Sequence, residues 1–134
     1  MKIQWDDSWN TGISVIDQQH QKLLNLVNDL GDAMRLGKSK DVLEDVLTVL
    51  VEYTATHFTQ EEGLMSRASY DGLEKHKQEH AGFIKKISDY GTRVKSGSAL
   101  VSVDMMSFLS KWLIQHIKGA DRQYVPAVRG KSIT

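Results

Sequence analysis

Apolar residues recur at three- and four-residue intervals along four stretches of the chain, and this is the period of an amphipathic α-helix. In the first stretch, for example, Leu23, Val27 and Leu30 fall on one face of a helix. The expected helices cover about residues 17–36, 41–65, 71–95 and 104–118. Pro126 is the single proline of the chain, so no proline interrupts any of these stretches.

The helix boundaries carry signals of their own. Three pairs have the spacing of an N-terminal capping interaction: Ser14 with Asp17, Asp41 with Glu44, and Asp71 with Glu74. Glycine is the usual residue just beyond the end of a helix, because it adopts the left-handed conformation without strain. Gly37 and Gly97 are therefore the expected stops of the first and third helices.

Long amphipathic helices with short connections pack as antiparallel neighbours. The sequence therefore predicts an all-α fold, an up-down-up-down antiparallel four-helix bundle with an N-terminal arm. No repeat or linker divides the chain, so residues 1–134 are expected to form one domain. Residues 1–15 form the arm, whose Trp5 and Trp9 are expected to pack on the bundle, and residues 119–134 form a C-terminal segment.

Composition narrows the function classes. Seventeen basic residues balance seventeen acidic ones, which gives no electrostatic reason to expect binding to nucleic acid or to an anionic membrane. No apolar run approaches the roughly 20 residues that cross a bilayer, so we expect no membrane insertion by this domain. The absence of cysteine excludes disulfides and thiolate metal sites and is compatible with a cytoplasmic location.

Polar residues interrupt the apolar faces at a few positions, and all five histidines of the chain are among them. The candidate site residues are His20, His57, Glu61, His76, His80, His116 and Asp121. Each buried polar group without a partner costs on the order of 1–3 kcal/mol. The burial of seven such groups therefore needs an explanation. A metal provides one, because neutral imidazole nitrogens and carboxylate oxygens become ligands.

The spacing of these residues supports a metal site. His76 and His80 are four residues apart, as are His57 and Glu61, and four residues correspond to about 40° around a helix. Each pair is therefore able to hold one ion from one helix face. A lone buried histidine is more often a hydrogen-bonded core residue, but all five histidines on the inner faces of one bundle favour a metal.

His116 and Asp121 are five residues apart, which is about 140° around a regular helix. On such a helix their side chains do not converge. Gly119 lies between them and predicts that the helix ends or loosens there, which lets Asp121 turn inward.

Seven ligands are too many for one tetrahedral zinc ion, and two octahedral ions fit better. If both carboxylates and a solvent oxygen bridge the ions, five histidines divide as three and two. One ion then has a single open position for a small ligand. The ferritin-like di-iron fold is the obvious rival, but its mark is a glutamate three residues before a histidine, and no glutamate here has that spacing.

Longer motifs carry a family resemblance that covers nearly the whole chain. They are GISVIDQQHQKLL around His20, HFTQEEGLM from His57, KHKQEH around His76 and His80, and WLIQHIKGADRQY around His116. These segments resemble the hemerythrin family, and most closely its bacterial branch. Members of that branch often have Tyr-Pro before the third helix, where this chain has Tyr70 and Asp71.

The resemblance implies a non-haem di-iron centre, with two oxo- or hydroxo-bridged iron ions, that binds dioxygen reversibly. His76, His80 and His116 would hold the saturated iron. His20 and His57 would hold the iron with the open position, and Glu61 and Asp121 would bridge. The resemblance also implies an oxygen pocket formed by Phe58, Trp112, Leu113, Ile117 and Tyr124.

The expected function is therefore oxygen transport, storage or sensing, and not catalysis. A di-iron oxidase or peroxidase, with the same ligands, is the first alternative. The second is the oxygen- or redox-sensing domain of a larger chemotaxis or signalling receptor, with a signalling partner. Nitric oxide is a further ligand that the open position accepts. The sequence leaves open whether the domain is free-standing, and whether it carries, stores or senses oxygen.

Overall fold

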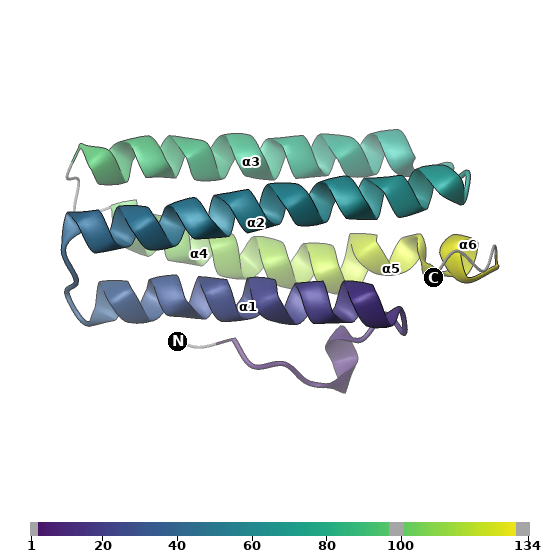
Figure 1. Cartoon of the computed structure of the whole chain (residues 1–134), viewed down its shortest axis with the longest axis horizontal. Helices are drawn as coiled ribbons and strands as arrows, with labels where there is room; N and C mark the ends of the chain where they lie inside the picture. Colours follow the sequence, from purple (N-terminus) through teal and green to yellow (C-terminus); the bar gives the residue numbers. More distant parts are fainter. Residues whose placement is uncertain (1–2, 97–100, 131–134) are drawn as a thin grey trace.

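The computed structural model describes residues 3–96 and 101–130. Its long helices are α1 (Ser14–Arg35), α2 (Lys40–Arg67), α3 (Leu73–Lys95) and α4 (Val101–Gln115). Each of these helices packs on two of the others, in the pairs α1–α2, α2–α3, α3–α4 and α1–α4. Successive helices run in opposite directions (Figure 1). The predicted all-α, up-down-up-down four-helix bundle is confirmed.

The N-terminal ends of these helices differ from the sequence prediction. Helix α1 begins three residues earlier than expected, at Ser14, and no side chain caps it. Asp17 accepts hydrogen bonds from the backbone N–H groups of Thr11 (2.8 Å) and Gly12 (3.2 Å) instead. The capping pair of Ser14 with Asp17 is therefore wrong. Asp17 fixes the turn before the helix, in which Gly12 has a φ of 85°.

The other two expected capping pairs are also wrong. Helix α2 is capped by Ser39, whose hydroxyl accepts from the backbone N–H of Val42 at 3.3 Å. Helix α3 begins at Leu73, after Gly72, and has no side-chain cap. Gly37 is a stop as predicted, because it follows α1 with a φ of 68°. Gly97, the expected stop of the third helix, lies outside the described residues.

The C-terminal region is more helical than the prediction of a plain segment from residue 119. The regular part of α4 ends at Gln115, and a π-helical turn, η2, covers His116–Ala120. Two short helices follow, α5 (Asp121–Gln123) and α6 (Val125–Gly130). A π-helical turn has one residue more than an α-helical turn, and such turns occur often at functional sites.

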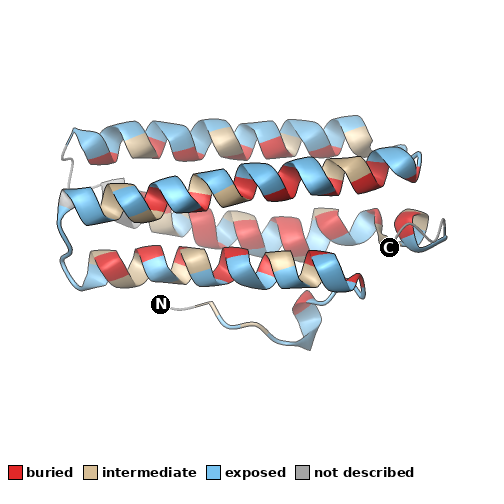
Figure 2. Cartoon of the chain, in the orientation of Figure 1, coloured by how far each residue is buried: buried red, intermediate tan, exposed pale blue. Residues whose placement is uncertain are grey.

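The inner stripes of the bundle are buried (Figure 2) and form two apolar clusters. The larger one follows the bundle and includes Leu30, Leu50, Ile87 and Leu109. The smaller one lies around the start of α1, the end of α2 and helix α6, and its residues are Ile13, Ile16, Leu64, Met65, Ala68, Tyr124 and Val128. Each fully buried large side chain contributes roughly 1.5–3 kcal/mol, so the larger cluster supplies most of the driving force.

The N-terminal arm packs on the C-terminal region. Trp9, in the short 3₁₀-helix η1 (Asp7–Trp9), is buried and stacks on Trp5 with ring centroids 5.7 Å apart. The ammonium group of Lys118 lies 4.8 Å from the centre of the Trp9 ring. The guanidinium of Arg122 donates to the backbone carbonyl of Ser8. The arm therefore contacts both the π-helical turn and α5.

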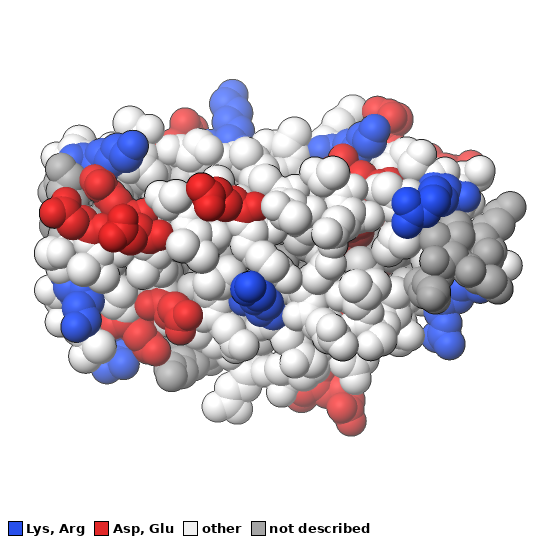
Figure 3. Space-filling model, viewed as in Figure 1, with Lys and Arg blue, Asp and Glu red and all other residues white. Residues whose placement is uncertain are grey.

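The surface carries charges of both signs. Acidic and basic side chains are mixed on the face in Figure 3, and a broad uncharged area lies over the first half of α1 and the second half of α2. Across the described residues, no helix combines the length and the apolar character that crossing a bilayer requires.

Candidate metal centre

The structure brings all seven candidate residues together in the interior of the bundle. Their side chains come from α1 (His20), α2 (His57 and Glu61), α3 (His76 and His80), the π-helical turn (His116) and α5 (Asp121). All seven are buried, with at most 5% of each residue exposed. Along α1, His20 falls between Ile16 of the smaller apolar cluster and Leu23 of the larger one.

The two pairs at four-residue spacing each point into the site from one helix face. The rings of His76 and His80 lie with their centroids 4.6 Å apart. Nε2 of His57 lies 3.5 Å from Oε2 of Glu61.

The π-helical turn explains how the last pair converges. On a regular α-helix, Asp121 would lie about 140° around from His116. The extra residue of the π-helical turn brings residues five apart onto the same side. Nε2 of His116 consequently lies 3.0 Å from Oδ1 of Asp121. The π-helical turn is therefore the form taken by the loosening of the helix that Gly119 predicts.

Glu61 faces four of the five histidines and divides its two oxygens between them. Oε1 lies 3.3 Å from Nε2 of His76 and 3.1 Å from Nε2 of His80. Oε2 lies 3.5 Å from Nε2 of His20 and 3.5 Å from Nε2 of His57. One carboxylate therefore joins two separate groups of imidazoles.

Asp121 joins the same two groups. Its Oδ1 lies 2.7 Å from Nε2 of His76 and 3.0 Å from Nε2 of His116. Its Oδ2 lies 3.1 Å from Nε2 of His20. Two sets of donor atoms result, within each of which all atoms lie within 4.8 Å of one another. We call them the three-histidine group (Glu61, His76, His80, His116 and Asp121) and the two-histidine group (His20, His57 and Glu61).

The carboxylates change the acid–base properties of the histidines. Burial acts to lower the pKa of His20, but the carboxylates of Asp121 and Glu61 outweigh it and raise that pKa to about 9. The same balance raises the pKa of His76 to about 9. Conversely, burial opposes ionisation of Glu61, yet the surrounding imidazoles hold its pKa well below the usual range. In the metal-free chain, protons therefore supply the positive charge that the buried carboxylates require.

Several buried atoms at the site have no satisfactory partner without a cation. Within the described part of the chain, Nδ1 and Nε2 of His20 and Oε1 of Glu61 make no hydrogen bond, although carboxylate oxygens lie near Nε2 of His20. Nε2 of His80 faces Nε2 of His116 at 3.1 Å, while Nδ1 of His80 lies 2.8 Å from a carboxylate oxygen of Glu62. If both rings carry their proton on Nδ1, the lone pairs of the two Nε2 atoms point at each other. A cation between them removes this repulsion.

The chemistry of the donor set fits iron. Imidazole is a good ligand for iron and zinc, and carboxylate oxygen suits harder and more oxidised ions. Five imidazoles and two carboxylates exceed the four ligands of a structural zinc ion. Two octahedral ions, each with shared carboxylates, use all seven residues.

The five residues expected in an oxygen pocket take different positions. Leu113 and Ile117 are buried in the larger apolar cluster. The hydroxyl of Tyr124 donates to Oε2 of Glu61 at 2.8 Å. Phe58 stacks on His80, with ring centroids 3.7 Å apart and an interplanar angle of 1°. Phe58 therefore lies against the three-histidine group as well as beside His57, from which its ring centroid is 5.9 Å away.

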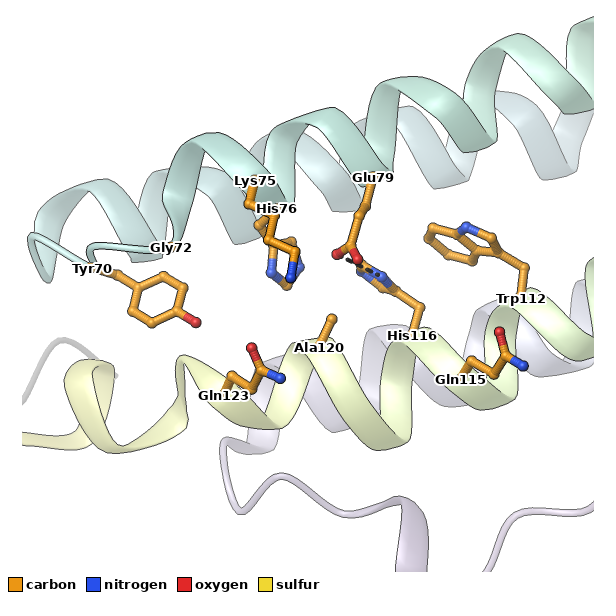
Figure 4. Close-up of a pocket in the computed structure, with 10 residues that line it drawn as sticks. All are labelled: Tyr70, Gly72, Lys75, His76, Glu79, Trp112, Gln115, His116, Ala120 and Gln123. Atoms are coloured by element: carbon orange, nitrogen blue, oxygen red, sulfur yellow. Dashed lines mark ion pairs between the residues drawn. The ribbon is translucent and has the colours of Figure 1, made fainter.

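Trp112 also lies against the three-histidine group. Its indole stacks on His116 at 4.2 Å and 15° and is only half-buried. A cavity of about 220 Å³ opens beside these two rings (Figure 4), and it is lined by residues of α3, α4 and the π-helical turn. His76 and Glu79 lie on its α3 side. The sequence does not predict this cavity, because its lining comes from segments that are far apart in the chain.

The outer partners of the histidines were also missed. Gln19, Glu62 and Glu79 approach the outward-facing nitrogens of His57, His80 and His116. All three are next to a candidate ligand in the sequence, but adjacency on a helix gives no signal that a side chain reaches back to the site.

The family model described as the hemerythrin HHE cation binding domain matches residues 11–128, which include all seven candidate residues. The chain belongs to the hemerythrin family. It is 42% identical over 125 residues to a bacteriohemerythrin of Pseudomonas aeruginosa, an alignment that covers 93% of this chain and 80% of the relative. It is 31% identical over 121 residues to a myohemerythrin of Theromyzon tessulatum, with 90% and 89% covered.

Solved structures agree with this assignment. A wild-type hemerythrin crystal structure superposes with a TM-score of 0.86 at 28% sequence identity, over 94% of this chain and 97% of the other. The sequence comparison and the structure comparison therefore both identify the hemerythrin four-helix bundle.

Proposed function

We propose that this hemerythrin-family protein binds dioxygen reversibly at a non-haem di-iron centre. One observation carries the proposal: both buried carboxylates divide their oxygens between a two-histidine and a three-histidine group. That division is what two bridged ions of unequal coordination require. The similarity to bacteriohemerythrin and myohemerythrin supports the same reading.

In this proposal His76, His80 and His116 would hold one iron, His20 and His57 would hold the other, and Glu61 and Asp121 would be shared by both. All seven of these residues are buried. A pair of ferrous ions would supply the electrons for reversible oxygen binding and an open coordination position.

The surrounding residues keep this position dry and ordered. In this proposal Leu113 and Ile117, which are 2% and 1% exposed, would form part of an apolar wall beside it. Exclusion of water slows the irreversible oxidation of a ferrous centre. The hydroxyl of Tyr124 donates a hydrogen bond to Glu61 and so holds this carboxylate in place. While this bond is made, the hydroxyl proton is directed at Glu61 and not at a bound ligand.

A di-iron oxidase or peroxidase is the main alternative, and it needs a proton donor beside the open position. Tyr124 is the donor that the sequence offers. Burial and the nearby Glu61 and Asp121 carboxylates raise the pKa of its phenol far above the usual range, which opposes proton release at neutral pH. Because the hydroxyl of Tyr124 is also bonded to Glu61, we rank oxygen binding above an oxidase reaction.

Within this function, the role of the protein is oxygen transport, storage or sensing, and the last of these requires a signalling partner. Nitric oxide is a second diatomic ligand that we propose for the same open position.

An optical titration tests the proposal. The metal-free protein is loaded with ferrous iron under argon, exposed to air and then purged again. We expect two irons per chain and a charge-transfer band that appears with oxygen, disappears on purging and returns over many cycles. A band that decays once to a stable ferric spectrum would support the oxidase, and the absence of any band would reject both functions.

A further inference from the structure

The five histidines all direct Nε2 toward the two carboxylates, so Nδ1 is the nitrogen that faces outward from the site. The group that Nδ1 meets differs between the two halves of the site. This difference is independent of the ligands themselves, and the family assignment does not predict it.

The two-histidine group has neutral surroundings. Nδ1 of His57 lies 2.6 Å from the amide oxygen of Gln19. The amide nitrogen of Gln19 donates to the side-chain oxygen of Gln60, so the carbonyl of Gln19 is fixed toward His57. Nδ1 of His20 has no hydrogen-bond partner among the residues that the structure describes. The surface above this half belongs to the uncharged area of Figure 3.

In the three-histidine group, the Nδ1 atoms of His80 and His116 face carboxylates. Nδ1 of His80 lies 2.8 Å from Oε2 of Glu62, whose side chain is 24% exposed. Nδ1 of His116 lies 3.7 Å from Oε2 of Glu79, whose side chain is 39% exposed. The contact between Glu79 and His116 is visible at the cavity beside Trp112 (Figure 4).

The charge of the outer group controls how strongly an imidazole donates to a metal. A histidine ligand that gives its second N–H to a carboxylate becomes a more basic ligand than one that gives it to a neutral group. Hydrogen bonds to an ionised acceptor are also roughly twice as strong as neutral ones.

We infer that Gln19 and Glu62 are positioning residues that make the two irons electronically unequal. The carboxylate of Glu62, behind His80, stabilises the ferric state of the three-histidine iron. The neutral amide of Gln19, behind His57, keeps the two-histidine iron electron-poor. The inference rests on the proposed di-iron function. Gln19 and Glu62 act through His57 and His80, and neither touches the oxygen ligand.

The test is a set of charge exchanges that keep side-chain size. Glu62→Gln removes the charge behind His80, and Gln19→Glu adds one behind His57. Glu52→Gln is the matched control, because Glu52 is an exposed acid on the same helix, more than two turns from Glu62. Each iron-loaded variant is held under argon, and its reduction potential and its ⁵⁷Fe Mössbauer spectrum are measured.

We expect Glu62→Gln to lower the ratio of oxidised to reduced iron at a fixed potential by about tenfold, equivalent to about 59 mV for one electron. Gln19→Glu is expected to raise that ratio by a similar factor. The Mössbauer signal of one iron changes in each variant, and it is a different iron in the two. Equal potentials in Glu62→Gln, Gln19→Glu and Glu52→Gln, or the same iron changing in both, would overturn the inference.

If Glu62→Gln does not retain two irons, Glu79→Gln is measured in its place. Its reduction potential is expected to shift in the same direction by a smaller amount. No shift in Glu79→Gln would then count against the inference. All measurements are made without oxygen. A failure of reversible oxygen binding in the optical titration is therefore distinct from a failure of the electronic asymmetry.

Discussion

The hydroxyl of Tyr124 donates a hydrogen bond to Oε2 of Glu61 across the buried interior, at 2.8 Å. Tyr124 itself is fully buried and belongs to the smaller apolar cluster. It therefore links the buried carboxylate of Glu61 in α2 to the short helices at the C-terminal end of the bundle. The same side chain serves packing and the site.

Tyr124→Phe keeps the ring and removes this hydrogen bond. We expect the metal-free variant to lose about 1–3 kcal/mol of unfolding free energy, because Oε2 of Glu61 is left buried with weaker partners. The iron-loaded variant should lose less, since iron satisfies the same oxygen. Urea denaturation of both forms measures the difference. Equal losses in the two forms would show that the hydroxyl serves packing alone.

His76→Ala removes the imidazole that contacts both bridging carboxylates. We expect iron content below two per chain and a loss of about 3–5 kcal/mol, because a buried charged partner of Asp121 disappears. Iron analysis and thermal denaturation check this. Gln78→Ala, at an exposed position of the same helix, is the control and should retain iron and stability. Unchanged iron content in His76→Ala would contradict the ligand assignment.

Gly119→Ala tests the π-helical turn. A Cβ at Gly119 would meet no atom within 4 Å, so the substitution is sterically free. Alanine favours a regular α-helix over glycine by up to about 1 kcal/mol. We expect the metal-free protein to be as stable or more stable, and its iron affinity to fall, because a regular helix turns Asp121 away from His116. Competition with a ferrous chelator measures the affinity, and a gain in both quantities would contradict the argument.

Stability should depend on pH in opposite ways in the two forms. In the metal-free protein, the raised pKa of His20 and His76, about 9 against an ordinary 6.5, stabilises the fold fully below pH 6.5. This contribution is lost as the pH rises from 6.5 through 9. The lowered pKa of Glu61, against an ordinary 4.5, gives stability that is present above pH 4.5 and is lost in more acid solution.

We therefore expect the metal-free protein to be most stable between about pH 4.5 and 6.5. Iron requires deprotonated histidines, so iron affinity should rise over the range in which the metal-free fold weakens. Denaturation of both forms at a series of pH values checks this. A stability of the metal-free protein that increases from pH 6.5 to 9 would contradict the assigned protonation.

The sequence predicts the features of this molecule that depend on helical periodicity. The bundle follows from the four apolar stripes, and the convergence of His57 with Glu61 and of His76 with His80 follows from four-residue spacing. Gly119 gives the position at which α4 loosens. These are local relationships within one helix, and the 3.6-residue period fixes them before any helix packs on another.

The remaining features depend on contacts between helices or between turns. Asp17 bonds to the preceding turn instead of capping α1, and competing polar partners of this kind do not appear in a spacing pattern. Gln19 reaches His57 only because α1 and α2 lie side by side. Phe58 of α2 stacks on His80 of α3 only because these two helices are neighbours.

The division of the interior into two apolar clusters has a consequence for how the protein acquires its cofactor. The larger cluster has residues from all four long helices, while the smaller one joins residues that lie far apart in the chain at one end of the bundle. We expect the bundle to assemble first, and iron to enter during brief openings of that end, without global unfolding. Maturation would then be limited by the frequency of a local fluctuation, which amide hydrogen exchange in α6 reports.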